Sequence, residues 1–381
     1  MSLITDNTPL AAFIASLEHE TFVTVDTEFM RDRTYYSQLC LIQIAGEQNA
    51  AVIDALVPGI DLTPVYDLFQ NNQIMKVLHA PRQDLEIFFQ ARQIFPRPLF
   101  DTQLAAMFLG YGDEVGYESL VNRIANARLD KSSRLTDWSH RPHTDAQVNY
   151  ALSDVTHLRT IYTELSRELE KRDRISWVRE ETERLLDPAL YEIDRNDVWR
   201  RLKIRSKDPR FLAVLRAVAA WREDRARSKD VPRARILRDE VLAEIAARKP
   251  SSVDDLRSIP RVSVDRQSGE DIVAAIAEAA DLPDEACPRL DQAQRLPKGI
   301  GPLTDLLKVF LRLACEEHDL AQRLVAVTKD LELFAAGRDK DLPFLEGWRL
   351  QVFGADAKRL RAGEIALRAR GKRVEPVETA G

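Results

Sequence analysis

An apolar, β-branched run that ends in two acids, Val-Thr-Val-Asp-Thr-Glu-Phe-Met at residues 23–30, most constrains what this chain can fold into. Side chains at i and i+2 of a strand point to the same face, so Asp26 and Glu28 are expected to project side by side. Two such carboxylates about 4 Å apart repel each other by roughly 4 kcal/mol at an effective dielectric constant of about 20. The pair therefore indicates either a cation site or the solvated end of a strand.

Short strands and helices alternate in the first half of the chain. Strands are expected at residues 22–29, 39–45, 51–53 and 74–79. Helical periodicity is expected at 9–19, 63–69, 84–93, 102–109, 117–124 and 145–169. Strands followed by helices predict an α/β domain over residues 1–170.

The second half of the chain carries helical patterns. A helical linker is expected at 171–205, a first helical domain at 206–286 and a second at 295–375. Asp208 before Pro209 has the pattern of an N-cap followed by proline at the first helical position. The last residues, 371–381, are expected to form a disordered tail.

Composition sets the class of protein. The 381 residues exceed one ordinary domain, and 45% of them are hydrophobic without an apolar run near the roughly 20 residues that span a bilayer. The N-terminus lacks the pattern of a signal peptide, so we expect a cytoplasmic protein without membrane association. Cys40, Cys287 and Cys315 are widely spaced, which argues against a zinc knuckle and a disulfide framework.

Charge is unevenly distributed along the chain. The net charge is −6, yet residues 195–249 hold 17 Lys and Arg against 8 Asp and Glu, a local balance of +9. Such a segment suits contact with a phosphate backbone, and it equally suits a solvated, salt-bridged helix face.

Further acids follow at positions that suit the Asp26 and Glu28 pair. Asp84 follows a predicted strand and is expected at a helix N-terminus, whereas Tyr150 and Asp154 are neighbours at i and i+4 of a helix. Carboxylates and water are the ligands that Mg²⁺ and Mn²⁺ prefer. Two such ions about 3.5–4 Å apart are able to clamp a phosphodiester.

These residues resemble the three motifs of DEDD-superfamily 3′-5′ exonucleases, in the subgroup with tyrosine in the third motif. Residues 26–36, Leu-Ile-Gln-Ile at 41–44, Leu-Asp-Lys-Ser at 129–132 and Thr-Asp-Trp at 136–138 resemble the bacterial ribonuclease D family. The segment near 206–286 is similar to the HRDC domain, and that near 295–375 to its degenerate second copy. The resemblance implies a ribonuclease H-like mixed sheet with helices on both sides, followed by all-α domains.

The resemblance also implies roles for individual residues. Asp26 would bridge two divalent ions, Glu28 and Asp154 would hold the ion that activates water, Asp84 would help to place the other ion, and Tyr150 would orient the water. Thr27, Phe29 and Met30 are expected to contact the terminal nucleotide, although core packing is as good an explanation for Phe29 and Met30. The candidates for RNA backbone contacts are Arg222, Arg225, Arg227, Arg233, Arg235 and Arg238. Among these we predict Arg222, Arg225 and Arg233 as substrate-binding residues.

The expected activity is 3′-5′ hydrolysis of RNA to nucleoside 5′-monophosphates by a monomer that uses two Mg²⁺ or Mn²⁺ ions. The resemblance implies tRNA precursors, or other structured RNA with a single-stranded 3′ end, as substrates. A DNA exonuclease and a non-catalytic RNA-binding module are the alternatives, since the motif residues do not report the sugar.

Several polar residues have simpler explanations. Asp101 before Thr102 has the pattern of a helix N-cap. His140 and His143 are spaced like a pair of metal ligands, but Pro142 between them would break the helix that aligns them, so we interpret both as ordinary loop residues. Lys131, Arg134 and Arg141 are further candidates for phosphate contacts, although exposed charges are common.

Overall fold

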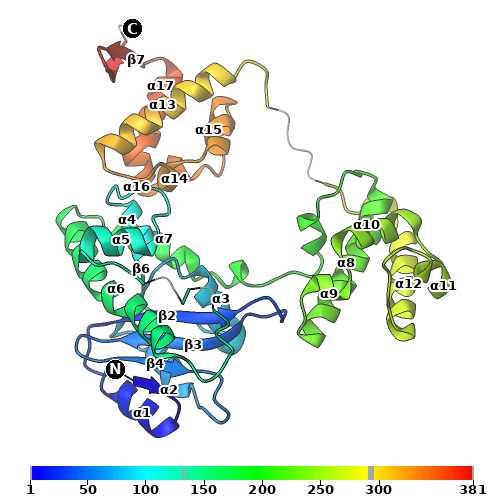
Figure 1. The fold of residues 1–381 in the computed structure, drawn as a ribbon. Coiled ribbons are helices and arrows are strands. Elements are labelled where there is room, and N and C mark those ends of the chain that lie inside the picture. The colour runs from blue at the N-terminus through cyan, green and yellow to red at the C-terminus, as the bar shows by residue number, and fades with distance from the viewer. Residues whose placement is uncertain (1, 131–132, 135, 291–295, 380–381) are drawn as a thin grey trace.

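The strand with the paired acids lies inside a six-stranded mixed sheet of order β1-β4-β3-β2-β5-β6 (Figure 1). The computed structural model describes residues 2–130, 133–134, 136–290 and 296–379. The strands are β1 (Ser2–Ile4), β2 (Phe22–Met30), β3 (Gln38–Ala45), β4 (Ala50–Asp54), β5 (Met75–Leu78) and β6 (Leu99–Asp101). The predicted mixed sheet is confirmed, whereas β1 and β6, three residues each, were not expected.

The acidic end of β2 extends beyond one of its neighbours. β3 pairs antiparallel with β2 from Thr24 to Met30, but β5 pairs in parallel with only Phe22, Val23 and Thr24. The register with β3 shifts between Glu28 and Phe29, which marks a β-bulge. The last residues of β2 therefore lie at an open edge of the sheet, where helices bring further side chains.

Helices cover both faces of this sheet. They are α1 (Asn7–Ala15), α2 (Thr63–Gln70), α3 (Arg82–Arg92), α4 (Thr102–Met107), α5 (Tyr117–Leu120), a π-helical turn (Val121–Ala125) and α6 (Asp145–Lys171). Apolar side chains of α1, α2 and α3 share one core cluster with Val23, Val25, Ile42 and Ile44. On the other face, Ala151 and Leu152 of α6 pack with Leu41 and Val52.

A basic helical unit, residues 198–287, has a hydrophobic core of its own. After α7 (Ile175–Leu185) and a 3₁₀ turn (Pro188–Leu190), this unit contains a 3₁₀ turn (Val198–Arg201), α8 (Pro209–Lys229), α9 (Arg233–Ile236), α10 (Asp239–Arg248), α11 (Val253–Arg257), α12 (Arg266–Ala280) and a 3₁₀ turn (Asp284–Ala286). Its core includes Val198, Trp199 and Leu202, which fall in the segment predicted as linker. Asp208 caps α8 as predicted, because its carboxylate accepts from the amides of Arg210 and Phe211.

The C-terminal helical unit, residues 301–379, contains α13 (Gly301–Glu317), α14 (Gln322–Val325), α15 (Thr328–Ala335), a 3₁₀ turn (Pro343–Leu345), α16 (Gly347–Arg349), a π-helical turn (Leu350–Gly354), α17 (Ala355–Ala362), β7 (Ile365–Arg370) and β8 (Arg373–Glu378). β7 and β8 form an antiparallel hairpin. The prediction of a disordered tail from residue 371 is therefore wrong as far as residue 379. No helix in the described parts of the chain is long and apolar enough to cross a membrane.

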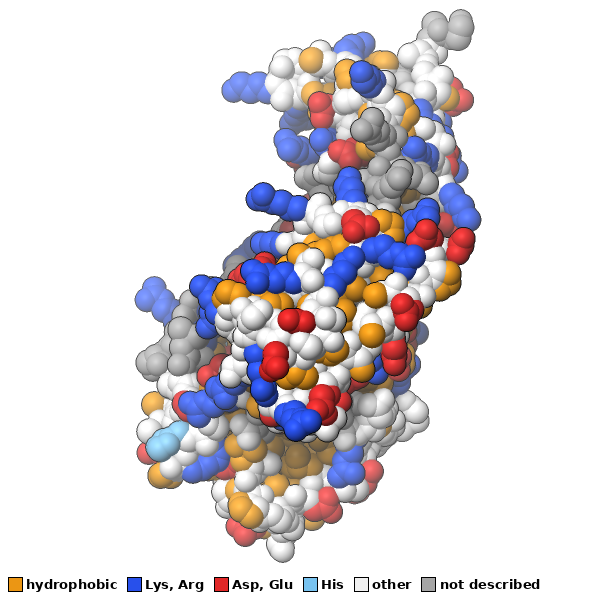
Figure 2. Space-filling model, turned by 90° about the vertical axis from the view of Figure 1, so that its right-hand side faces the viewer, with side chains coloured by type: hydrophobic (Ala, Val, Ile, Leu, Met, Phe, Trp, Pro, Cys, Tyr) orange, Lys and Arg blue, Asp and Glu red, His pale blue; other side chains and the backbone are white. Residues whose placement is uncertain are grey.

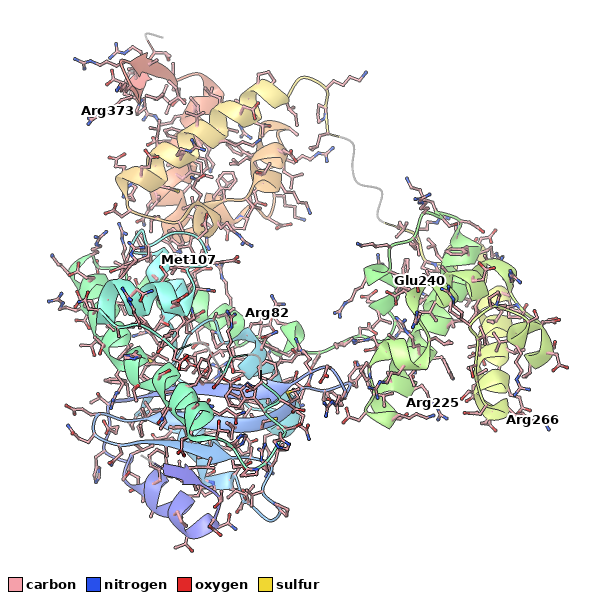
Figure 3. The ribbon with its side chains drawn as sticks, viewed as in Figure 1. Arg82, Met107, Arg225, Glu240, Arg266 and Arg373 are labelled. Atoms are coloured by element: carbon pink, nitrogen blue, oxygen red, sulfur yellow. The ribbon has the colours of Figure 1, made fainter. Side chains whose placement is uncertain are left out.

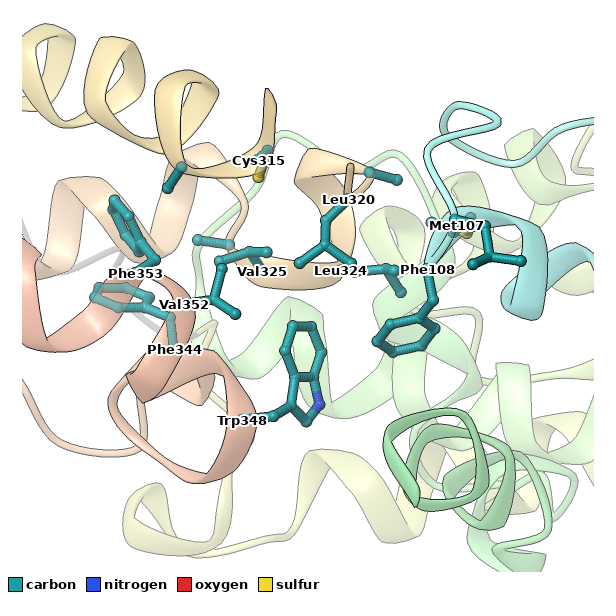
Figure 4. Close-up of a cluster of buried hydrophobic side chains, with 14 of the residues drawn as sticks. Met107, Phe108, Cys315, Leu320, Leu324, Val325, Phe344, Trp348, Val352 and Phe353 are labelled. Atoms are coloured by element: carbon teal, nitrogen blue, oxygen red, sulfur yellow. The ribbon is translucent and has the colours of Figure 1, made fainter. Parts of the chain in front are cut away.

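The C-terminal helical unit shares its core with the α/β domain. Met107 and Phe108 of the α/β domain belong to the same buried cluster as Leu324 and Trp348 (Figure 4). The ring of Trp348 stacks on Trp177 of α7 with centroids 5.0 Å apart. The α/β domain and the C-terminal helical unit thus pack into one body, whereas the basic helical unit packs around a separate core.

A cluster of polar groups, here called the Tyr35 clasp, joins the β2–β3 loop to the basic helical unit. The Tyr35 hydroxyl contacts the buried carboxylate of Glu223 and accepts from Arg227 at 3.0 Å and Arg233 at 3.1 Å. The backbone amides of Tyr35 and Tyr36 donate to Asp230 at 3.0 and 3.1 Å. The loop that follows the acidic strand is therefore held by α8.

Candidate active site

Three carboxylates converge at the open end of β2. Asp26, Glu28 and Asp154 each offer one oxygen, and these oxygens all lie within 4.8 Å of one another. The two-residue spacing on β2 places Asp26 and Glu28 on the face that α6 covers, and Asp154 comes from α6 itself. The predicted convergence of strand and helix acids is present in the structure.

Asp84 reaches the same end of the sheet from the first turn of α3. Its side chain is buried, and the hydroxyl of Thr27 donates to its carboxylate. Thr27 is buried as well, so the structure gives this residue a contact inside the site. Its predicted contact with the terminal nucleotide stays a prediction.

Burial raises the pKa of every acid in this cluster, and repulsion from neighbouring carboxylates adds to the effect for Asp26 and Glu28. Burial, and then the charges of Asp154 and Asp84, raise the pKa of Glu28 to about 9, and burial with the neighbouring carboxylates also raises that of Asp26 well above its ordinary value. Burial raises the pKa of Asp154 to about 7 and that of Asp84 to about 6. A positive charge bound among these acids would favour their ionised forms and lower their pKa values again.

Tyr150 lies beside these acids, one helical turn before Asp154. The phenol acts to lower the pKa of Asp154, and burial followed by the charge of Asp154 raises the pKa of the phenol itself. The buried ring of Trp138 stacks on the ring of Tyr150, with centroids 6.0 Å apart and an interplanar angle of 29°. The phenol is therefore fixed in direction and keeps its proton at neutral pH.

A pocket of about 310 Å³ opens onto this cluster. Asp26, Tyr150 and Asp154 line it together with Arg134, one of the candidates for phosphate contacts. The remaining lining residues were not selected from the sequence: His79, Gly116, Tyr117, Glu118, Leu129 and Leu158. The positive charge of Arg134 acts against the raised pKa values of Glu28 and Asp154. The pocket thus combines an acidic wall, two phenols and a cation.

The loop beside the pocket is held by Asp101. Its carboxylate accepts from the backbone amide of Gln103 at 2.8 Å, which confirms the predicted N-cap of α4, and from that of Ala80 at 2.9 Å. Nδ1 of His79 lies 3.0 Å from the Thr102 hydroxyl, and burial lowers the pKa of His79 to about 4. His79 is therefore a neutral group of the pocket wall.

The other predicted contacts have partners within the protein. Phe29 and Met30 are half-buried and pack against apolar clusters on either face of the sheet. Two side-chain nitrogens of Arg141 lie 2.8 and 2.6 Å from the carboxylate of Asp54. His143 has a buried ring near the same carboxylate, and Lys131 lies outside the described residues.

The three selected arginines differ in their surroundings. Arg222 is buried and donates to the carbonyl of Leu237 and to Asp239, and Arg233 forms two hydrogen bonds to Glu223. Arg225 is half-buried and lies 3.7 Å from Asp265, at the end of the basic helical unit near the β2–β3 loop in Figure 3. Long-range ion pairs of this kind are not visible in sequence.

The donor set fits a hard divalent cation. Asp26, Glu28 and Asp154 supply only oxygen atoms, which is what Mg²⁺ and Mn²⁺ prefer over softer ligands. The oxygens lie close together and the pKa of Glu28 is raised, so the ionised carboxylates would repel one another. A bound divalent ion would remove this repulsion.

Comparison with known proteins defines the class. Residues 1–170 match the family model described as 3′-5′ exonuclease, and residues 211–276 match the HRDC domain. The fold and the acid cluster thus define a 3′-5′ exonuclease that carries an HRDC domain, a class that depends on divalent cations.

The particular family follows from matches over nearly the whole chain. The chain is 46% identical to ribonuclease D of Gluconacetobacter diazotrophicus over 98% of its own length and 96% of the relative's, and 48% identical to that of Jannaschia sp. over 98% and 99%. The crystal structure of Escherichia coli RNase D, described as an exoribonuclease involved in structured RNA processing, matches with a TM-score of 0.80 and 29% identity over 94% of this chain and 98% of that one. The chain belongs to the ribonuclease D family and is a 3′-5′ exoribonuclease.

Proposed function

We propose that Asp26, Glu28, Asp84, Tyr150 and Asp154 form the catalytic site, and that the chain uses two Mg²⁺ or Mn²⁺ ions to remove nucleotides from the 3′ end of RNA. The observation that carries this proposal is the approach of three carboxylate oxygens within 4.8 Å of one another, from β2 and α6. The enzyme family narrows the substrate to RNA.

Asp26, Glu28 and Asp154 are the residues that would hold the ions, with Asp84 acting from the buried position in which Thr27 holds it. Bound ions supply charge that stabilises both the attacking and the leaving oxygen of a phosphodiester and lower the pKa of water. The protein's own contribution is to hold the four acids on rigid elements.

Tyr150 orients the attacking water. Its raised pKa keeps the phenol protonated at neutral pH, so it acts through the direction of its hydroxyl and does not remove the proton as a phenolate. The stacked ring of Trp138 fixes the plane of the phenol, and the Asp154 carboxylate is its neighbour one helical turn further on. This positioning reduces the entropy that the reaction loses in its transition state.

Hydrolysis forms a bond between the water oxygen and the phosphorus of the terminal phosphodiester and breaks the bond from phosphorus to the 3′ oxygen of the preceding nucleotide. That oxygen takes up a proton, so the products are a nucleoside 5′-monophosphate and an RNA shortened by one residue with a free 3′ hydroxyl.

We propose structured RNA with a single-stranded 3′ tail, in particular the 3′ trailers of tRNA precursors, as the substrate. Thr27, Phe29 and Met30 would lie next to the terminal nucleotide because they flank the acids on β2. The backbone contacts that this proposal retains are the exposed Arg235 and Arg238 together with Arg225, whose distance to Asp265 is 3.7 Å. Arg222, Arg227 and Arg233 are set aside because each donates hydrogen bonds to groups of the protein. On the face of the molecule in Figure 2, Lys and Arg side chains are interspersed with acids.

The test is a gel time course with a 5′-labelled RNA hairpin that carries a short 3′ tail, in Mg²⁺ or EDTA. Wild type and Asp145→Asn, which changes an exposed acid on the same helix, should produce a ladder that shortens from the 3′ end. EDTA and Asp154→Asn should abolish it. An intact tail with wild type in Mg²⁺ would contradict the proposal, and a matched DNA strand in parallel tests the choice of sugar. The cytoplasmic location and the monomeric state stay predictions.

A further inference from the structure

Gln43, in the middle of β3, is fully buried, yet both polar atoms of its side chain lack a hydrogen-bond partner among the described residues. Its neighbours along the strand, Leu41, Ile42 and Ile44, are apolar and equally buried. A buried amide without a partner weakens a fold relative to an apolar side chain of the same shape. Such a residue is expected where function, and not stability, has determined the side chain.

Gln43 lies directly opposite Asp26 in the antiparallel ladder between β2 and β3. Residues opposite each other in such a ladder point to the same face, with Cβ atoms about 4.5–5.5 Å apart. This face is the one that α6 covers, because Thr24, two residues before Asp26, donates its hydroxyl to the carbonyl of Val155 at 2.8 Å. The Gln43 amide therefore lies between β3 and α6, beside the carboxylate cluster.

Three carboxylates, those of Asp154, Asp84 and Glu28, act on Asp26. The backbone amide of Thr27 donates to its carboxylate. A side-chain donor next to a metal-binding carboxylate fixes its direction, and the loss of such a donor typically weakens metal binding about 10–100-fold. Gln43 is the residue of β3 paired with Asp26, and its side chain carries an N–H donor without a partner among the described residues.

We propose that Gln43 is a positioning residue for the cation site, whose amide N–H donates to the carboxylate of Asp26 when the cluster holds its divalent ion. This inference rests on the proposed function, because it assumes that Asp26 binds cations. It assigns a task to the one polar residue of the Leu-Ile-Gln-Ile run that packing does not explain.

The test uses Gln43→Met, which keeps the length of the side chain and removes its hydrogen-bonding atoms. In EDTA the variant should melt at the wild-type temperature or above it, because no protein hydrogen bond is lost. The Mg²⁺ concentration at half of the thermal shift should rise about 10-fold, and kcat at fixed Mg²⁺ should fall while KM for RNA stays unchanged. Leu41→Met, on the same face of β3, is the packing control and should leave the Mg²⁺ midpoint unchanged.

A Gln43→Met variant with the wild-type Mg²⁺ midpoint would overturn the inference, and so would a variant whose only change is a lower melting temperature in EDTA. A second measurement needs no variant to fold: with ¹⁵N-glutamine labelling, Mg²⁺ should shift the Gln43 side-chain amide resonances and slow their exchange with solvent. Unchanged resonances would reject the role of this amide. If wild type itself showed neither thermal shift nor RNA shortening with Mg²⁺, the proposed function would fail instead.

Discussion

The ring of Trp138 lies parallel to that of Tyr150 within 29°, with the tryptophan buried and the tyrosine at the edge of the pocket. Because small errors in the position of a catalytic group reduce rates strongly, we predict that Trp138→Leu lowers kcat about 10–100-fold with little change in KM. Trp138→Phe, which keeps an aromatic ring, should lose less. Single-turnover kinetics on a short RNA would measure both, with circular dichroism to establish folding. Equal loss in the two variants would argue against a role for stacking.

The acid cluster predicts that the cation-free protein loses stability as the pH rises. The folded-state pKa values of Glu28, Asp154 and Asp84, about 9, 7 and 6, exceed the ordinary values of 4.5 and 3.8, so the folded state binds more protons than the unfolded state. The free energy of unfolding should therefore fall between about pH 5 and pH 9. Thermal melts in EDTA would show a falling Tm, and Glu28→Gln should reduce the slope. A Tm independent of pH would contradict the raised pKa values.

Divalent cations should stabilise the folded state through the same cluster. At a hundredfold excess over Kd, binding to the folded state alone adds about 2.7 kcal/mol. Mg²⁺ or Mn²⁺ should therefore raise the Tm of wild type clearly more than that of Asp26→Asn, with Asp145→Asn behaving like wild type. Identical shifts in wild type and Asp26→Asn would exclude a shared cation site at Asp26.

Loss of the Tyr35 clasp should affect the activity on long, structured RNA and leave the activity on short RNA unchanged. Tyr35→Ala removes the hydroxyl contacts and the ring that lies 4.7 Å from the guanidinium of Arg233. The activity on a trinucleotide should stay near the wild-type value, whereas kcat/KM on hairpin RNA should fall several-fold, because the basic helical unit is held less firmly. Tyr36→Ala removes the exposed neighbouring ring and is the matched control. Equal losses on both substrates would show instead that the clasp supports β2 itself.

Lys76 on β5 is a structural cation. Its buried ammonium donates to the carbonyls of Asn71 at 2.6 Å, Ile74 at 2.7 Å and Arg97. Lys76→Met would remove this donor from all three carbonyls, of which that of Asn71 keeps the amide of Ile74 at 3.2 Å. We expect a loss of about 2–4 kcal/mol in the free energy of unfolding. Urea denaturation would measure it. A loss below about 1 kcal/mol would mean that water satisfies these carbonyls.

Local patterns in the sequence predicted much of the site. The spacing of Asp26 and Glu28, the pair of Tyr150 and Asp154, and the caps at Asp101 and Asp208 each depend on a few consecutive residues, and the structure agrees with them. Partners that are distant in sequence were not predictable. Arg233 reaches Tyr35 and Glu223 only in the folded chain, so its charge pattern alone resembled an RNA contact.

Elements whose formation depends on distant partners were also missed. β1 has three residues and exists because it pairs with β4, and β6 because it pairs with β5. The alternating pattern of β7 and β8 is short and rich in arginine, and it gave no strand signal without its hairpin partner. Gln43 was quoted only as part of a motif, although a polar residue within an apolar strand is a usable signal.

The core that the α/β domain shares with the C-terminal helical unit determines how the enzyme would respond to being shortened. The chain leaves this common body before residue 198 and returns to it at residue 301, so the basic helical unit is joined to the body by the chain at both of its ends and by the Tyr35 clasp. Cutting the chain after residue 287 would remove one of these connections and would also remove Trp348, which packs on Phe108 and Trp177. Truncation there would thus destabilise the α/β domain that carries the acid cluster, in addition to removing one connection of the basic helical unit.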